Sequence, residues 1–146
     1  MRLLWGFLSL FIACNAEIAQ QKPLVIITAS YNNSQWCKKY LDSIAQQTYQ
    51  NWFLIYINDN STDDTLECIT SLIYEYHLED KVLILNNPER KGHLYNQYHA
   101  IHSVDSDKII VIVDGDDWLA HENVFATINT IYQDPDIWLT YGQFWY

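Results

Sequence analysis

Ile109-Ile110-Val111-Ile112-Val113 runs directly into Asp114-Gly115-Asp116-Asp117, and this stretch decides the fold. An unbroken run of β-branched apolar residues predicts a strand that is covered on both faces, as in a parallel sheet between helices. Ligands of such sheets bind beyond the carboxyl ends of the strands, where these carboxylates stand. Crowded carboxylates repel one another, and their hard oxygens suit Mg²⁺ or Mn²⁺, so the stretch predicts a metal site. The alternative is a polar turn that caps the next helix.

The composition predicts a globular domain with a buried core. The chain has 146 residues, of which 49% are hydrophobic and 15% aromatic, whereas a disordered chain would be poorer in both. Its formal net charge is -10, and its eight Lys and Arg residues form no basic stripe. We therefore expect no nucleic acid partner, and an anionic ligand would need a bridging cation.

Residues 1–16 differ from the rest and are expected to be a leader. Met1-Arg2 precedes the apolar stretch Leu3 to Ala13, which small residues follow as far as Ala16. This order predicts a secretory signal peptide that is cleaved after Ala16. The alternatives are a lipoprotein signal ending at Ala13-Cys14 and an uncleaved anchor, although a spanning helix needs about 20 apolar residues.

Past the leader, expected strands alternate with expected helices. The strands are expected at residues 24–28, 52–57, 82–85, 109–113 and 138–141. The buried helix faces are expected to carry Cys37, Leu41 and Ile44; Leu66, Ile69 and Ile73; and Leu94, Tyr98 and Ile101. Ser34 and Ser61 are expected to cap the first two of these helices, and a last helix is expected from about residue 124 to residue 132. This order predicts an α/β domain with a mostly parallel sheet in a three-layer α/β/α arrangement.

Two pairs of possible ligand residues are read as structural. Cys37 and Cys68 are expected on helices as core residues, although a disulfide is permitted if the chain is exported. His99 and His102 are three positions apart on an expected helix and could face one way as metal ligands. Without further ligands nearby, the sequence does not favour a metal site there.

Three segments leave the carboxyl ends of expected strands at the same edge of the sheet. They are VIITASYN at residues 25–32, INDNSTDDT at residues 57–65 and DGDD at residues 114–117. In order and spacing they resemble the N-terminal, nucleotide-binding half of a family 2 glycosyltransferase, which is a nucleotide-diphospho-sugar transferase of the Rossmann-like GT-A fold. Gln46-Gln47-Thr48-Tyr49 fits the same family. The resemblance covers residues 23–146, which we expect to form one domain that is incomplete on its C-terminal side.

The resemblance implies roles for residues at the first two strand ends. Ala29, Ser30 and Tyr31 would line the nucleobase pocket, and the ring of Tyr31 would pack on the base. Asp59 would accept a hydrogen bond from the uracil-like edge of the base. Read without the family, Tyr31 is a core aromatic residue and Asp59 belongs to an Asx turn.

The resemblance also implies a diphosphate site. Asp114 would lie at the ribose side, and Asp116 and Asp117 together would bind Mn²⁺ or Mg²⁺ beside the diphosphate. Arg90 or Lys91 could reach the same diphosphate, and the alternative for that pair is a solvated surface turn.

The function implied is transfer of a sugar from a nucleotide-diphosphate donor, UDP-sugar first, to an unknown acceptor by metal-dependent, inverting displacement. The catalytic base is expected beyond Tyr146. One alternative is a non-catalytic fragment that binds nucleotide sugars. Another is a haloacid-dehalogenase-type phosphatase, which the stretch from Ile110 to Asp116 also fits. The expected location is the lumen of the endoplasmic reticulum or Golgi, or outside the cell, with membrane contact only through a retained leader.

Overall fold

Four parallel strands form the centre of the molecule. The computed structural model describes residues 20–142, so the expected leader lies outside the described residues. The strands are β1 (Leu24–Ser30), β2 (Trp52–Asn58), β3 (Val82–Asn86) and β4 (Ile109–Ile112). They are ordered β3-β2-β1-β4, with β1 paired to β2 and β4, and β2 paired to β3. The loops that follow β1, β2 and β4 therefore meet at one edge, as the sequence predicts.

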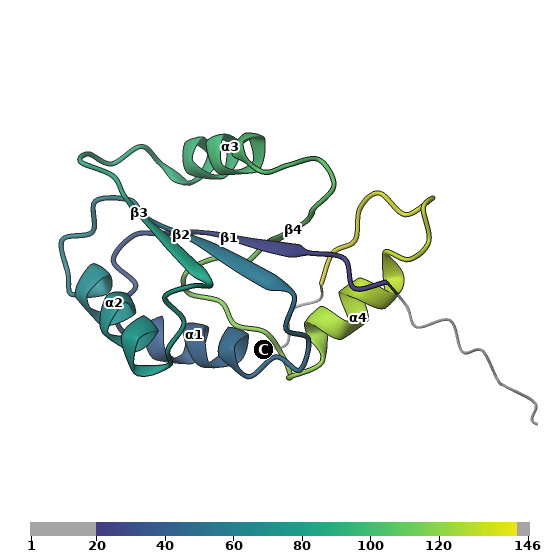
Figure 1. The fold of residues 1–146 in the computed structure, drawn as a ribbon. Coiled ribbons are helices and arrows are strands. Elements are labelled where there is room, and N and C mark those ends of the chain that lie inside the picture. The colour runs from purple at the N-terminus through teal and green to yellow at the C-terminus, as the bar shows by residue number, and fades with distance from the viewer. Residues whose placement is uncertain (1–19, 143–146) are drawn as a thin grey trace, which may run out of the picture.

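Helices cover both faces of the sheet (Figure 1). The helices are α1 (Cys37–Ala45), α2 (Thr65–Glu75), α3 (His93–Ser103) and α4 (Val124–Ile131). Helix α3 lies on one face, and α1, α2 and α4 lie on the other (Figure 1). The predicted three-layer α/β fold with a parallel sheet is confirmed. Within residues 20–142, no helix is both long and apolar enough to cross a membrane.

Two apolar clusters hold these layers together. The larger joins β1 and β2 to α1, α2 and α4, and it includes the fully buried Tyr40, Tyr56 and Phe125. The smaller packs Ala100 of α3 against Val25, Ile27, Ile55 and Ile57. Strand β1 is buried along its whole length because it is central and covered on both faces.

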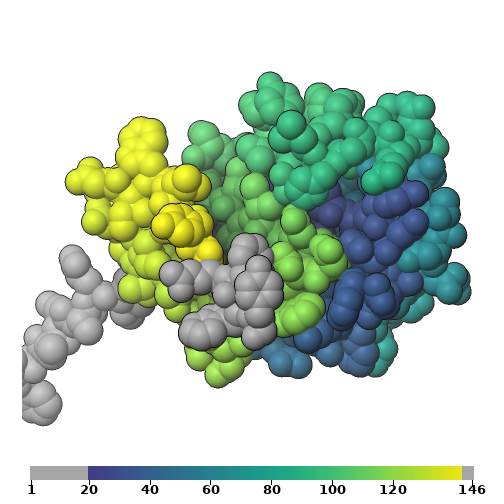
Figure 2. Space-filling view, turned by 180° about the vertical axis from the view of Figure 1, so that it is seen from behind, coloured from purple at the N-terminus to yellow at the C-terminus, as the bar shows by residue number. Residues whose placement is uncertain are grey.

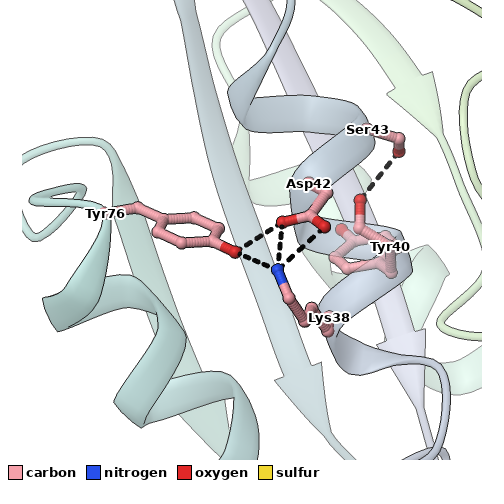
Figure 3. Close-up of polar contacts among 5 residues, drawn as sticks. All are labelled: Lys38, Tyr40, Asp42, Ser43 and Tyr76. Atoms are coloured by element: carbon pink, nitrogen blue, oxygen red, sulfur yellow. Dashed lines mark hydrogen bonds and ion pairs between the residues drawn. The ribbon is translucent and has the colours of Figure 1, made fainter.

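A polar cluster joins α1 to the residue that follows α2 (Figure 3). The hydroxyl of Tyr76 donates to the carboxylate of Asp42, and Lys38 Nζ lies 3.0 Å from Asp42 Oδ2 and 2.7 Å from the Tyr76 hydroxyl. The Lys38–Asp42 ion pair spans one turn of α1 and is exposed, so its contribution to stability is small. This cluster links α1 to the C-terminal end of α2.

Some predicted elements differ from the structure. Residues 138–141 form no strand, because none of the four strands described within residues 20–142 pairs with them, and Trp138, Leu139 and Tyr141 are exposed. The strand predicted at residues 109–113 is β4, and both its faces are covered in part: Val111 packs against the larger cluster and Ile110 against the smaller, whereas Ile112 is 49% exposed. The last helix, α4, is where the sequence predicts it.

The predicted helix caps are also wrong. Helix α1 begins at Cys37 and α2 at Thr65, and neither has a side-chain cap. Ser34 instead donates its backbone N–H to Asp63, and the Ser61 hydroxyl donates to Asn58. Both serines connect the loop after β1 to the loop after β2, because the Ser61 hydroxyl also accepts from the Asn32 backbone N–H at 3.0 Å.

Helix α3 is rotated from the predicted orientation. Asn96 and Ala100 are its buried residues, whereas Leu94 and Tyr98 are 78% and 56% exposed. The helix begins after Gly92, whose φ of 90° lies in the left-handed region. Of the predicted face only Ile101 packs against the smaller cluster, and the polar Asn96 takes an inward position that hydrophobicity does not indicate.

Candidate nucleotide-sugar site

A cleft of about 200 Å³ opens at the carboxyl ends of β1, β2 and β4, beside the first turn of α3. Figure 2 shows the first part of the described chain (purple) beside the residues that follow β4 (light green), below α3. Its lining consists of Ala29, Ser30, Tyr31, Asn33, Asp59, Arg90, His93, Asn96, Asp114 and Asp116. Most of the residues that the sequence singles out therefore meet in one cleft, and Lys91 and Asp117 are not in its lining.

The acidic loop after β4 rests directly on the end of β1. The backbone N–H of Asp117 donates to the Asp114 carbonyl at 3.1 Å, which closes the loop into a turn. A Cβ atom on Gly115 would lie 2.5 Å from Ser30 Oγ and 2.9 Å from Asn33 Nδ2. Such distances are too short for real atoms, so only glycine allows this close approach. Gly115 thus brings Asp114 and Asp116 to the cleft.

The carboxylates of this loop act on one another. Burial, followed by the negative charges of Asp116 and Asp114, raises the pKa of Asp117 above its usual value of 3.8. His93 Nε2 lies 3.5 Å from Asp114 Oδ1 across the cleft. A cation placed among the carboxylates would relieve their repulsion, so the loop fits a hard divalent metal ion.

The loop does not form a complete metal site by itself. No group of three or more His, Cys, Asp or Glu side chains within residues 20–142 is arranged to hold a metal ion. Mg²⁺ characteristically takes one or two protein carboxylates and completes its coordination with waters and substrate phosphates. Asp116 and Asp117 match that incomplete ligand set. His99 and His102 do not add to it, because their rings pack against Tyr95 and Tyr98 on α3.

Asp59 follows β2 and is 3% exposed. Its Oδ1 accepts from Asn87 Nδ2 and from the Lys91 backbone N–H, and its Oδ2 accepts from the Gly92 backbone N–H, each at 2.8 Å. Burial alone would raise the pKa of Asp59, but the nearby amide of Asn96 and these three donors lower it to about 2. The carboxylate is therefore ionised at neutral pH, and it holds the turn that precedes α3.

Tyr31 and Arg90 face each other across the cleft. The guanidinium carbon of Arg90 lies 3.8 Å from the centre of the Tyr31 ring, a cation–π arrangement. One face of Tyr31 is therefore covered by Arg90. The side chain of Lys91 pairs with Glu89 instead, and only its backbone N–H contacts a predicted site residue.

The loops after β1 and β2 are joined by polar contacts. Asn32 has a left-handed φ of 55°, and its Oδ1 accepts from the Thr62 backbone N–H at 2.8 Å. The Asn33 backbone N–H donates to the Thr65 hydroxyl at 2.8 Å. Asp63 accepts hydrogen bonds from Ser34 and Thr65. Burial raises the pKa of the Asp63 carboxyl, but these hydrogen bonds outweigh burial and lower the pKa to about 2. Residues 62–65 thus hold the loop after β1 in place beside the cleft through hydrogen bonds.

Asn33, His93 and Asn96 line the cleft but were not predicted as site residues. Asn33 follows Tyr31 closely, and that position was a signal that the sequence offered. His93 and Asn96 lie in the first turn of α3, for which the sequence predicts only a buried apolar face. Only the rotation of α3 places them in the cleft.

The profile of glycosyl transferase family 2 matches residues 25–143. The chain belongs to this family. It is 28% identical over 120 residues to the glycosyltransferase GlyG of Streptococcus pneumoniae serotype 4, a match that covers 82% of this chain and 38% of GlyG. The chain thus spans less than two fifths of that relative's length. This family membership disfavours the phosphatase alternative.

Solved structures agree on the fold. The mannosyltransferase PcManGT from Pyrobaculum calidifontis, in complex with GDP-Man and Mn²⁺, superposes with a TM-score of 0.66 at 20% identity, over 75% of this chain and 32% of that one. TarS 1-349 of S. aureus, in complex with UDP-GlcNAc, gives a TM-score of 0.64 at 17% identity, over 77% and 31% of the two chains. The GT-A arrangement of the described residues is therefore shown.

Proposed function

We propose that this chain forms the donor-binding part of a metal-dependent glycosyltransferase that uses a nucleotide-diphosphate sugar, with a UDP-sugar as the preferred donor. The observation that carries the proposal is the cleft itself, where Tyr31, Asp59 and the Asp114–Asp117 loop converge from three strand ends. The likeness to two proteins solved with GDP-Man and UDP-GlcNAc supports a nucleotide-sugar ligand.

The proposed pose divides the cleft into a base end and a diphosphate end. The nucleobase packs beside Ala29, Ser30 and Tyr31, with Asp59 accepting from its imide N–H. Because Arg90 covers one face of the Tyr31 ring, the base stacks on the guanidinium or replaces it there. A displaced Arg90 guanidinium is free to neutralise the diphosphate. Lys91 has a lesser part, because its ammonium pairs with Glu89.

Asp114 lies at the ribose side, and Asp116 and Asp117 hold Mn²⁺ or Mg²⁺ at the diphosphate. When bound, the metal stabilises the negative charge that develops on the leaving nucleoside diphosphate. The acceptor hydroxyl attacks the anomeric carbon in line and inverts its configuration, and a base must take the hydroxyl proton. None of the residues 20–142 is assigned that role.

A thermal melt of the full chain with UDP, with and without Mn²⁺, tests the donor site. At 100 times the dissociation constant, a ligand adds about 2.7 kcal/mol. A domain of this size unfolds with an entropy of about 0.26 kcal/mol/K, so the melting temperature should rise by about 10 °C. The rise should need both ligands and should vanish in an Asp116→Asn, Asp117→Asn double variant. An Asp105→Asn, Asp107→Asn variant removes the same charge before β4 and should keep the rise. A cooperative melt that UDP and Mn²⁺ leave unchanged would contradict the proposal.

We also propose that residues 1–16 direct the chain into the secretory pathway lumen or out of the cell. The support is the order of charged, apolar and small residues in that segment. N-terminal sequencing of the expressed protein should give Glu17 as the first residue. An intact Met1 on a membrane-associated protein would favour the anchor instead.

A further inference from the structure

The amide of Asn96 is an unused hydrogen-bond donor in the cleft. Asn96 is 4% exposed and lines the cleft from the first turn of α3. Its Nδ2 makes no hydrogen bond of normal geometry among the described residues, although it lies close enough to Asp59 to lower the pKa of that carboxyl. A buried polar group without a partner is costly, and such groups in native proteins are characteristically satisfied by a ligand, an ion or water.

The orientation of this amide follows from its neighbours. An ionised Asp59 can only accept hydrogen bonds, so the Asn87 amide must turn its Nδ2 toward Asp59 Oδ1, at 2.8 Å. The same Asn87 Nδ2 donates its second hydrogen to Asn96 Oδ1, also at 2.8 Å. Asn96 therefore presents its oxygen to Asn87 and keeps its Nδ2 as the free end. The chain of donors and acceptors leaves no other assignment.

Asp59 offers the complementary acceptor beside this donor. Its Oδ1 already accepts two hydrogen bonds, whereas its Oδ2 accepts only one, from the Gly92 backbone N–H. A carboxylate oxygen has two lone pairs, so Oδ2 can accept once more. Asn87 contacts both residues, and the Asn96 amide lies close enough to Asp59 to lower the pKa of its carboxyl, so the two groups are neighbours in the lining of the cleft.

We propose that Asn96 determines nucleobase specificity: its Nδ2 donates to a carbonyl oxygen of the base while Asp59 Oδ2 accepts from the adjacent ring N–H. The inference rests on the proposed nucleotide-sugar function and names the chemistry that the site selects. Uracil carries an N3–H beside a carbonyl oxygen and meets both requirements. Cytosine has an unprotonated N3 and a 4-amino group, so it presents a lone pair to the Asp59 carboxylate and a donor where uracil has O4. The site therefore selects UDP over CDP, two ligands of equal size and charge.

Calorimetric titration of the full chain with UDP and with CDP, both with Mn²⁺, tests this inference. Wild type should bind UDP at least about tenfold more tightly than CDP, because the wrong base leaves buried polar groups unpaired. Asn96→Ala should weaken UDP binding at least about tenfold and should largely remove the preference. Gln97→Ala deletes the neighbouring amide of α3, which does not line the cleft, and should leave both affinities unchanged.

The outcomes separate the inference from the proposed function. Equal binding of UDP and CDP by wild type would overturn the inference and leave the donor site standing. An unchanged preference in Asn96→Ala would assign base selection to Asp59 alone. Failure of wild type to bind either diphosphate would overturn the proposed function and the inference with it. If Asn96→Ala does not fold, UDP is compared with its 4-thio derivative on wild type, because sulfur accepts hydrogen bonds more weakly than oxygen while N3–H is kept; equal binding would refute the Asn96 contact.

Discussion

Replacing Asp59 with asparagine should destabilise the fold by an amount that the structure allows us to work out. The carboxylate is 3% exposed and accepts hydrogen bonds from Lys91, Gly92 and Asn87. Its pKa falls from 3.8 to about 2 on folding. At 1.36 kcal/mol per pH unit, that difference corresponds to about 2 kcal/mol in favour of the ionised folded state.

The expected change in melting temperature follows from the size of the described domain. Residues 20–142 make 123 residues, and at about 2.1 cal/mol/K per residue the unfolding entropy is about 0.26 kcal/mol/K. Asp59→Asn should therefore melt about 8 °C below wild type at pH 7. Differential scanning calorimetry measures this shift, and hydrogen exchange at the Gly92 amide reports whether the turn before α3 detaches locally.

The pH dependence provides the decisive control. A carboxyl group whose folded pKa is lowered contributes stability that is fully present above pH 3.8 and is lost as the pH falls toward 2. The difference between wild type and Asp59→Asn should therefore narrow by about 2 kcal/mol between pH 5 and pH 2. Asp63 also titrates in this window, but it is present in both proteins and cancels from the difference. A difference that stays constant over the whole range would refute the assignment to the Asp59 charge.

Two further substitutions test how the cleft is assembled. Gly115→Ala should lower the melting temperature and weaken UDP binding, because its Cβ would lie 2.5 Å from Ser30 Oγ, whereas Gly142→Ala meets no atom within 4 Å and should change neither; equal effects of the two would contradict the close approach. Thr65→Val removes the hydroxyl that accepts from the Asn33 backbone N–H at 2.8 Å and should cost about 1–3 kcal/mol in denaturant unfolding. An unfolding free energy unchanged within experimental error would mean that the hydrogen bond between Asn33 and Thr65 does not stabilise the fold.

The sequence predicts the layers well because they depend on hydrophobic pattern and chain order. Parallel strands separated by helices leave few arrangements, so the edge where Tyr31, Asp59 and Asp114 meet follows directly. The predicted strand at residues 138–141 failed for the opposite reason, since a strand exists only where another strand pairs with it. Apolar and aromatic residues at positions 138–141 indicate a preference for extended backbone, but they do not indicate whether another strand lies beside them.

The sequence does not predict which face of α3 is buried, nor that His93 and Asn96 line the cleft. The helix begins where the Asp59 carboxylate accepts hydrogen bonds from the backbone of Lys91 and Gly92, 32 and 33 positions away. The periodicity of apolar residues within the helix does not indicate such long-range hydrogen bonds. The polar Asn96 then occupies an inward position that a hydrophobicity pattern assigns to an apolar residue. Sequence patterns fail here because a binding site requires polar groups where packing alone would not put them.

Linkage between Mn²⁺ and UDP tests the central claim most directly. If Asp116 and Asp117 supply only part of the metal's ligands, the diphosphate must complete the set, and each ligand must tighten the other by the same factor. Titration of Mn²⁺ into the full chain, with free Mn²⁺ counted by electron paramagnetic resonance, should give weak binding alone and at least about tenfold tighter binding with saturating UDP. The Asp116→Asn, Asp117→Asn variant should lose this coupling. Mn²⁺ binding that UDP leaves unchanged would contradict the account of a metal-dependent nucleotide-sugar site.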